Sequence, residues 1–251
     1  MKIMISGLCG YMGKELQKLL EENKRGMTLA CGVDAFAPDD YPIPCAKDFL
    51  SADSDVDCII DFSHHTVTKS LLDFATAHNI PTVLATTGQT EDEREYINKA
   101  SEKIPLFFAA NYSLGVALLI ELAKKTAEMM PDADIEIIEH HHNRKLDAPS
   151  GTALAIADAV KEVRKDANTV CGRSGKQKRE PDDIGISSVR MANVVGIHEV
   201  LVGTASQTIT LKHEAHSRAL FAEGALSAAE FLIGKPAGLY NMDDMISGDK
   251  K

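Results

Sequence analysis

The chain has 251 residues, of which 44% are apolar, so it can bury the core of one large domain or of two smaller ones. Its formal net charge of −10 argues against a nucleic-acid partner, which would require a basic surface. No apolar run approaches the roughly 18 residues of a transmembrane helix, and the five cysteines include no Cys-x-x-Cys pair, so we expect a cytoplasmic protein with reduced thiols and no membrane partner.

Short apolar strands alternate with helices over residues 1–112. The strands are apolar on both faces, which is typical of a parallel sheet covered by helices on both sides. We therefore predict an α/β, Rossmann-like domain. Its strands are expected at residues 2–6, 27–33, 56–62, 81–85 and 105–109, and its helices at residues 11–22, 66–78 and 91–103.

The pattern changes in residues 113–219, where turns and few helices separate the strands. This pattern predicts a second, α+β domain with an open mixed or antiparallel sheet. Residues 171–185 are polar and are expected to form a loop. The apolar face of a last helix, at residues 220–232, suits packing on the first domain, so we assign residues 220–251 to it. The other expected elements are helices at 114–130 and 152–163 and strands at 134–140, 185–191, 196–202 and 207–213.

A glycine turn joins the first strand to the first helix. Gly7, Gly10 and Gly13 allow a sharp turn and a close approach of the backbone to a pyrophosphate at the helix start. Their spacing differs from the usual Gly-x-Gly-x-x-Gly, and a tight turn without a ligand is the alternative. Asp34, at the end of the second strand, lies where an acid meets the adenosine ribose of a dinucleotide. Ala35 follows it where an arginine would pair with a 2′-phosphate, so we expect NADH to be used at least as well as NADPH.

Two further loops follow strands at the same edge of the expected sheet. They are Ala85-Thr86-Thr87-Gly88 and Ala109-Ala110-Asn111-Tyr112. Ligands in such folds bind outside the carboxyl ends of the strands, so both loops are candidates to contact the nicotinamide. Each is equally consistent with a polar helix cap.

A histidine-lysine loop follows the strand at 134–140. His140, His141 and His142 are adjacent, which does not match the usual spacing of zinc ligands, so we expect no metal. Lys145 adds a cation, and Pro149-Ser150-Gly151-Thr152 is a good helix start whose N–H groups would bind a carboxylate. A histidine can donate a proton near neutral pH. The residues alone do not decide which histidine is the acid.

From Glu139 the chain reads Glu-x-His-His-x-x-Lys-x-Asp-Ala-Pro-Ser-Gly-Thr, which resembles the signature of the 4-hydroxy-tetrahydrodipicolinate reductase family, also called dihydrodipicolinate reductases. The resemblance extends over essentially the whole chain, including Asp61-Phe62-Ser63 and Val189-Arg190 with Gly196-x-His198. It implies NAD(P)H-dependent reduction of a small cyclic dicarboxylate in lysine and diaminopimelate biosynthesis. It also implies a homotetramer built by the middle domain.

The resemblance assigns roles to individual residues of this chain. His141 matches the proton donor and Lys145 the second catalytic residue. The matching substrate-binding residues are His142, Lys145, Ser150, Gly151 and Thr152. The matching cofactor contacts are Gly7, Leu8, Cys9, Gly10, Tyr11, Met12, Asp34, Ala85, Thr86, Thr87, Ala109, Ala110, Asn111 and Tyr112.

Three other functions explain less of the sequence. A non-catalytic NAD-binding redox sensor would account for the glycine turn but not for the histidine-lysine loop. A metal-dependent hydrolase would use the histidines but not the turn. A two-domain dehydrogenase acting on a substrate such as aspartate semialdehyde would need a catalytic cysteine or a different lysine arrangement. The basic stretch Arg173–Arg179 is either a solvated loop or a guide for an anionic substrate.

Overall fold

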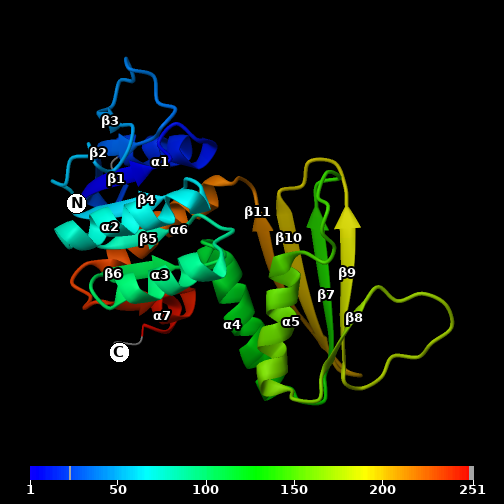
Figure 1. Cartoon of the computed structure of the whole chain (residues 1–251). Coiled ribbons are helices and arrows are strands. Elements are labelled where there is room, and N and C mark those ends of the chain that lie inside the picture. Colours follow the sequence, from blue (N-terminus) through cyan, green and yellow to red (C-terminus); the bar gives the residue numbers. More distant parts are fainter. Residues whose placement is uncertain (23, 249–251) are drawn as a thin grey trace. The chain divides into compact units, whose positions relative to one another are not determined.

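The computed structural model describes residues 1–22 and 24–248, which form two compact units (Figure 1). The first unit comprises Met1–Ser113 together with the chain from Ala219 onward, and the second comprises Leu114–Arg218. The sequence analysis placed the two boundaries between residues 112 and 113 and between residues 219 and 220, one residue away from those of the structure. The functional role of each unit stays a prediction. None of the described helices is long and apolar enough to cross a membrane.

A parallel sheet forms the centre of the first unit. In the described part of the chain its strand order is β12-β6-β5-β4-β1-β2-β3. The chain starts at β1, moves outward to β2 and β3, and then returns to the other side of β1. This reversal creates the switch point at which open α/β sheets bind ligands. The strands are β1 (Lys2–Ser6), β2 (Thr28–Val33), β3 (Cys45–Ala46), β4 (Cys58–Asp61), β5 (Thr82–Leu84), β6 (Pro105–Phe108) and β12 (Gly238–Tyr240).

Helices bury the apolar strands of this sheet. α2 and α3 pack together over a core that includes Ile59, Leu71 and Ile97, all nearly inaccessible to solvent. α1 packs against α6, which also contacts β4, β5 and β6. α6 thus belongs to the first unit, although the second unit lies between it and the rest of the first unit in sequence. The helices are α1 (Tyr11–Glu21), α2 (Thr68–His78), α3 (Glu91–Ser101), α6 (Ala219–Leu232) and α7 (Met242–Ser247).

The second unit is a mixed sheet with the strand order β11-β10-β7-β9-β8. β10 runs antiparallel to both of its neighbours, whereas β9 runs parallel to β7 and β8. α4 (Leu114–Met129) and α5 (Gly151–Val163) pack on one face over Ile135, Ile137 and Val200 (Figure 1). The strands are β7 (Asp134–His141), β8 (Asn168–Cys171), β9 (Asp183–Arg190), β10 (Gly196–Gly203) and β11 (Thr208–Ala215).

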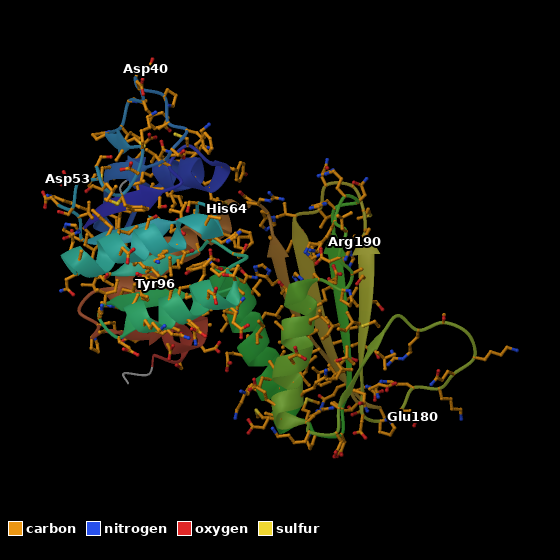
Figure 2. The ribbon with its side chains drawn as sticks, in the orientation of Figure 1. Asp40, Asp53, His64, Tyr96, Glu180 and Arg190 are labelled. Atoms are coloured by element: carbon orange, nitrogen blue, oxygen red, sulfur yellow. The ribbon has the colours of Figure 1, made fainter. Side chains whose placement is uncertain are left out.

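The expectation of a loop over residues 171–185 was wrong at both ends. Cys171 closes β8, and Asp183 opens β9. β8 is an edge strand with no fully buried residue, so it carries no apolar pattern that would reveal it. The polar loop is therefore shorter than predicted, and Figure 2 shows Glu180 within it.

Candidate functional site

The loop between β1 and α1 is a tight turn that requires glycine at two positions. Gly7 has a φ of +82°, and a Cβ on it would lie 2.5 Å from the carbonyl oxygen of Phe62. A Cβ on Gly13 would lie 2.2 Å from the carbonyl oxygen of Gly7. α1 begins after Gly10, which provides no side-chain cap, and its first turn holds no acidic residue. A helix start of this kind favours an anion.

Asp34 follows β2 and joins this turn to the neighbouring strand end. Its carboxylate accepts one hydrogen bond from the backbone N–H of Cys9 at 2.9 Å and one from that of Phe36 at 2.9 Å. The predicted ribose-binding acid and the glycine turn are therefore directly connected.

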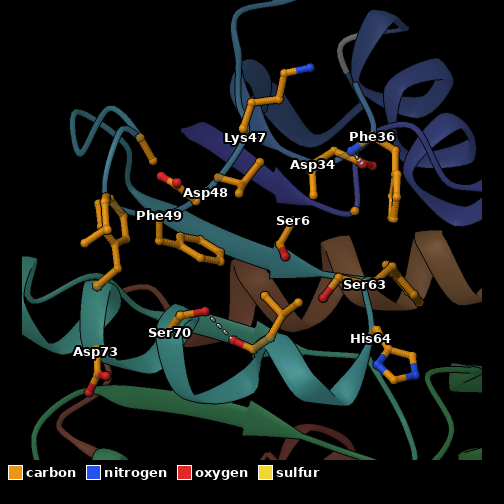
Figure 3. Close-up of a pocket in the computed structure, with 18 of the residues that line it drawn as sticks. Ser6, Asp34, Phe36, Lys47, Asp48, Phe49, Ser63, His64, Ser70 and Asp73 are labelled. Atoms are coloured by element: carbon orange, nitrogen blue, oxygen red, sulfur yellow. Dashed lines mark hydrogen bonds between the residues drawn. The ribbon is translucent and has the colours of Figure 1, made fainter. Parts of the chain in front are cut away.

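A cavity of about 840 Å³ opens beside Asp34, within the size range of sites for small ligands and cofactors. Figure 3 shows Asp34 and Lys47 on one side of this cavity and Ser63 and His64 on another. Sequence reasoning missed Lys47. It lies near Asp34 because β3 pairs with β2, so that Ala46 stands opposite Val33.

Lys47 has two partners on the loop between β2 and β3. Its ammonium group donates to the carbonyl oxygen of Ala37 and lies 3.1 Å from the carboxylate of Asp39. The Asp39 side chain is 97% exposed, so this ion pair competes with water and contributes little energy. The ion pair with Asp39 therefore holds the Lys47 side chain only weakly.

The loops after β5 and β6 place their predicted cofactor contacts differently. Thr87 and Ala110 are exposed, whereas Ala85, Thr86 and Tyr112 are buried. The Tyr112 hydroxyl donates to the carbonyl oxygens of Leu84 at 2.8 Å and Phe107 at 3.1 Å. Its side chain ties two strand ends together, and its own carbonyl oxygen packs against Gly224 of α6. Among the residues of the glycine turn, Leu8 is likewise fully buried.

Asp61 is a buried acid at the end of β4 to which the sequence assigned no separate role. Its side chain accepts hydrogen bonds from the Ser63 hydroxyl at 2.5 Å and from the Ser63 N–H at 3.3 Å. Burial raises the pKa of Asp61, and the hydrogen bonds from Ser63 oppose this rise. The carboxyl group thereby holds the turn that follows β4.

In the second unit, Glu139 and His141 lie on the same face of β7, as residues two apart in a strand must. The His141 Nδ1 atom lies 2.5 Å from the Glu139 carboxylate. Arg190, at the end of β9, donates to both carboxylate oxygens of Glu139, at 2.9 Å and 2.8 Å. Figure 2 shows where Arg190 lies in this unit. The alternation along the strand could have predicted the contact between Glu139 and His141, but not the contribution of Arg190.

The helix start at Ser150 was predicted, and the structure confirms it. The Ser150 hydroxyl accepts a hydrogen bond from the N–H of Ala153 and lies 3.1 Å from Nε2 of His198. The backbone N–H of Ser150 donates to Glu139 at 3.1 Å. Burial, aided by the charge of His141, lowers the pKa of His198 to about 4, so that ring is neutral near pH 7.

Lys145 and His142 lie in the loop between β7 and α5. The Lys145 ammonium group lies 2.8 Å from the carboxylate of Asp147 and lowers its pKa. Arg190 also donates to the carbonyl oxygen of Asp147 at 2.7 Å, which ties this loop to β9. Burial together with nearby cations lowers the pKa of His142. The loop thus combines cations with a neutral imidazole at neutral pH.

His140 stands on the other face of the sheet from His141, because successive side chains of a strand point to opposite faces. Its register partner is Ile197 of β10. Within residues 1–22 and 24–248, no group of three or more His, Cys, Asp or Glu side chains is arranged to hold a metal ion.

Comparison with known proteins gives the same family for both units. The family model described as "Dihydrodipicolinate reductase, N-terminus" matches residues 1–112, and that described as "Dihydrodipicolinate reductase, C-terminus" matches residues 115–246. The 4-hydroxy-tetrahydrodipicolinate reductase of Caldanaerobacter subterraneus subsp. tengcongensis is 44% identical over 248 residues, covering 98% of each chain. That of Clostridium novyi is 40% identical over 247 residues and also covers 98% of each.

A solved structure resembles the whole chain. It is the dipicolinate-bound dihydrodipicolinate reductase from Paenisporosarcina sp. TG-14, with a TM-score of 0.81 and 26% sequence identity. The match covers 96% of this chain and 97% of that one, so it includes both the parallel and the mixed sheet.

Proposed function

From the premise that this chain belongs to the dihydrodipicolinate reductase family, we propose which of its residues carry each part of the reaction. The chain is an NAD(P)H-dependent oxidoreductase that reduces 4-hydroxy-tetrahydrodipicolinate to tetrahydrodipicolinate, a step of lysine and diaminopimelate biosynthesis. Since its relatives are biosynthetic enzymes, we place this step in the cytoplasm.

We assign the nicotinamide cofactor to the first unit, where it supplies a hydride when bound. The turn at Gly7–Gly13 fits a pyrophosphate because it has no room for side chains at Gly7 and Gly13 and ends at an uncapped helix start. We expect the Asp34 carboxylate, which is hydrogen-bonded to the glycine turn, to accept hydrogen bonds from the adenosine ribose. The exposed Thr87 and Ala110, with the backbone of residues 109–112, are our candidates for holding the nicotinamide.

NADH is our proposed cofactor, with NADPH also accepted. Asp34 favours a ribose hydroxyl over a phosphate, and Ala35 supplies no cation at the position beside it. Lys47, however, lines the same cavity and can partly neutralise a 2′-phosphate. We therefore expect the preference for NADH to be small.

We assign the dicarboxylate substrate to the second unit. The exposed Gly151, whose Cβ position faces open space, and the neighbouring Thr152 present the start of α5 to a carboxylate. Lys145 and His142 supply the remaining contacts. The hydroxyl and the N–H of Ser150 are already engaged inside the protein, so we assign Ser150 to shaping this turn.

His141 is our proposed proton donor. The observation that carries this assignment is the anchoring of its Nδ1 atom, 2.5 Å from a buried carboxylate. This contact orients the ring and leaves Nε2 as the nitrogen that can reach a substrate.

We also propose that the mixed sheet builds a homotetramer. Its helices, α4 and α5, cover one face, and the opposite face of residues 114–218 carries the half-buried Ile138, Ile197 and Leu201. A second copy of this chain is the occupant that the family resemblance implies.

The test is the kinetics of two variants in a coupled assay, in which the upstream synthase supplies the unstable substrate and NADH oxidation is followed. We expect His141→Gln to lower kcat about 100-fold with little change in KM, because proton donation acts in the transition state. We expect Lys145→Ala to lower kcat and to raise KM, because Lys145 also binds the substrate.

His140→Gln is the matched control, since this neighbouring imidazole lies on the opposite face of the sheet. It should retain wild-type kinetics. A fully active His141→Gln variant would refute the assignment of the proton donor.

A further inference from the structure

We propose that Glu139 is a positioning residue that fixes the tautomer of His141 and, through a second hydrogen bond, holds that imidazole in register with the start of α5. This inference deepens the proposed function, because it rests on His141 as the proton donor. Glu139 itself is completely buried, so it acts through its neighbours rather than on the substrate.

Both carboxylate oxygens of Glu139 are used. Oε2 lies 2.5 Å from His141 Nδ1 and accepts a hydrogen bond from Arg190 at 2.9 Å. Oε1 accepts hydrogen bonds from the Ser150 N–H at 3.1 Å and from Arg190 at 2.8 Å. The bidentate contact with Arg190 has the geometry in which an arginine holds a carboxylate most rigidly.

Glu139 is ionised at neutral pH. Burial alone would raise its pKa, but hydrogen bonds from Arg190, Ser188 and His141 outweigh burial and lower the pKa to about 2. An ionised carboxylate accepts hydrogen bonds and donates none. The hydrogen between Glu139 and His141 must therefore reside on Nδ1.

This placement determines which nitrogen of His141 performs the chemistry. The imidazolium can release only its Nε2 proton without breaking the bond to Glu139, and it then becomes the neutral Nδ1–H tautomer. Glu139 keeps its negative charge throughout. The ring consequently has the same orientation before and after proton transfer.

The structure also leaves room beside Nε2. A Cβ on Gly196, the first residue of β10, would lie 3.3 Å from His141 Nε2 and 3.7 Å from Cδ2. Any larger side chain at this position would press on the nitrogen that we assign to the proton. The two residues therefore act on different nitrogens of His141: Glu139 restrains Nδ1, and Gly196 leaves space beside Nε2.

The second oxygen of Glu139 connects two parts of the site that the loop 142–149 separates in sequence. His141 ends β7, whereas Ser150 caps the start of α5 beside the proposed carboxylate-binding residues. A shared, buried carboxylate sets the spacing between them. Such positioning raises kcat because misplaced reacting groups lose rate steeply with distance.

The first experiment is a double-mutant cycle of Glu139→Gln and His141→Gln in the coupled assay. Glutamine has nearly the shape of glutamate, but its amide N–H groups would face the N–H donors that now bind Glu139. The His141 ring would lose its anchor, so we expect kcat to fall at least about tenfold. If Glu139 acts through His141, the double variant should be no slower than His141→Gln alone. Glu162→Gln, which removes a carboxylate paired with Lys124 in the same unit, is the control and should keep wild-type kcat.

The second experiment reads the tautomer directly in the unmodified protein. With ¹⁵N-labelled histidine, and with the His141 signals identified by their loss in His141→Gln, nitrogen chemical shifts across a pH titration should show the neutral ring protonated at Nδ1. In the Glu139→Gln variant, a larger fraction of the neutral His141 ring should be protonated at Nε2 instead of Nδ1.

Four outcomes separate this inference from the proposed function. An Nε2–H ring in the wild type would overturn the inference, as would independent, multiplicative effects in the cycle or a Glu139→Gln variant with wild-type kcat. A fully active His141→Gln variant would instead overturn the proposed proton donor. The wild-type spectrum decides the matter even if Glu139→Gln does not fold.

Discussion

Lys47 is the residue on which cofactor choice depends most directly. Its side chain is about half exposed beside Asp34, so pairing with a 2′-phosphate should be worth roughly 1 kcal/mol, or about fivefold in Kd. We expect the wild type to bind NADH at least as tightly as NADPH. Lys47→Ala should weaken NADPH about fivefold and leave NADH nearly unchanged, as measured by calorimetric titration. Equal weakening of both cofactors would show that Lys47 does not contact the 2′-phosphate.

His198 makes the stability of the second unit depend on pH. Its pKa is about 4 in the folded chain against 6.5 for an ordinary histidine, because it is buried near the charge of His141. The unfolded chain therefore binds more protons as pH falls from 6.5 to 4, and up to about 3 kcal/mol of stability should be lost across that window. Chemical denaturation of wild type and His198→Asn should show a shallower pH dependence for the variant between pH 5 and 6.5.

The comparison in that experiment isolates His198 for two reasons. His142 and His213 also have lowered pKa values, but they are present in both proteins. Glu139, whose pKa is about 2, loses its stabilising effect only below the ordinary glutamate value of 4.5. Above pH 7.5 both proteins should show the same slope, and identical slopes throughout would contradict the role of His198.

The positions of single site residues could be predicted from the sequence where the nearby residue pattern determines them. The contact between Asp34 and the glycine turn follows from strand order, and the Ser150 cap follows from the residues that start α5. Arg190 and Lys47 were not predictable in this way. Each reaches its partner only through strand pairing, β7 with β9 for Arg190 and β2 with β3 for Lys47.

At the scale of elements, the strands and helices with strong apolar patterns were predicted to within a few residues. The missed elements are short or exposed: β3 has two residues, β12 has three, and α7 has six. β8 lacks a buried face because it lies at the edge of the mixed sheet. β3 and β12 form by pairing with β2 and β6, whereas α7 is a short helix held by a local capping box between Asn241 and Asp244.

The same strand alternation gives β7 two different surfaces. Glu139 and His141 face the side on which α5 begins, whereas Glu136, Ile138 and His140 face the opposite side. On that opposite side, the neighbouring strand β10 adds Ile197 and Leu201. One strand therefore contributes both to the proposed site and to the proposed subunit interface.

At the scale of the whole molecule, the uncovered face of the mixed sheet predicts the oligomeric state. Leu201→Lys would replace a half-buried apolar side chain of this face, opposite Glu136, with a longer charged one, which costs free energy if a second copy packs on it. We expect light scattering to give a tetramer for the wild type and a smaller species for this variant. Leu154→Lys is the matched control, because Leu154 is 40% exposed on α5, away from that face, and it should remain tetrameric. A monomeric wild type, or a tetrameric Leu201→Lys variant, would show that this face is not the subunit interface.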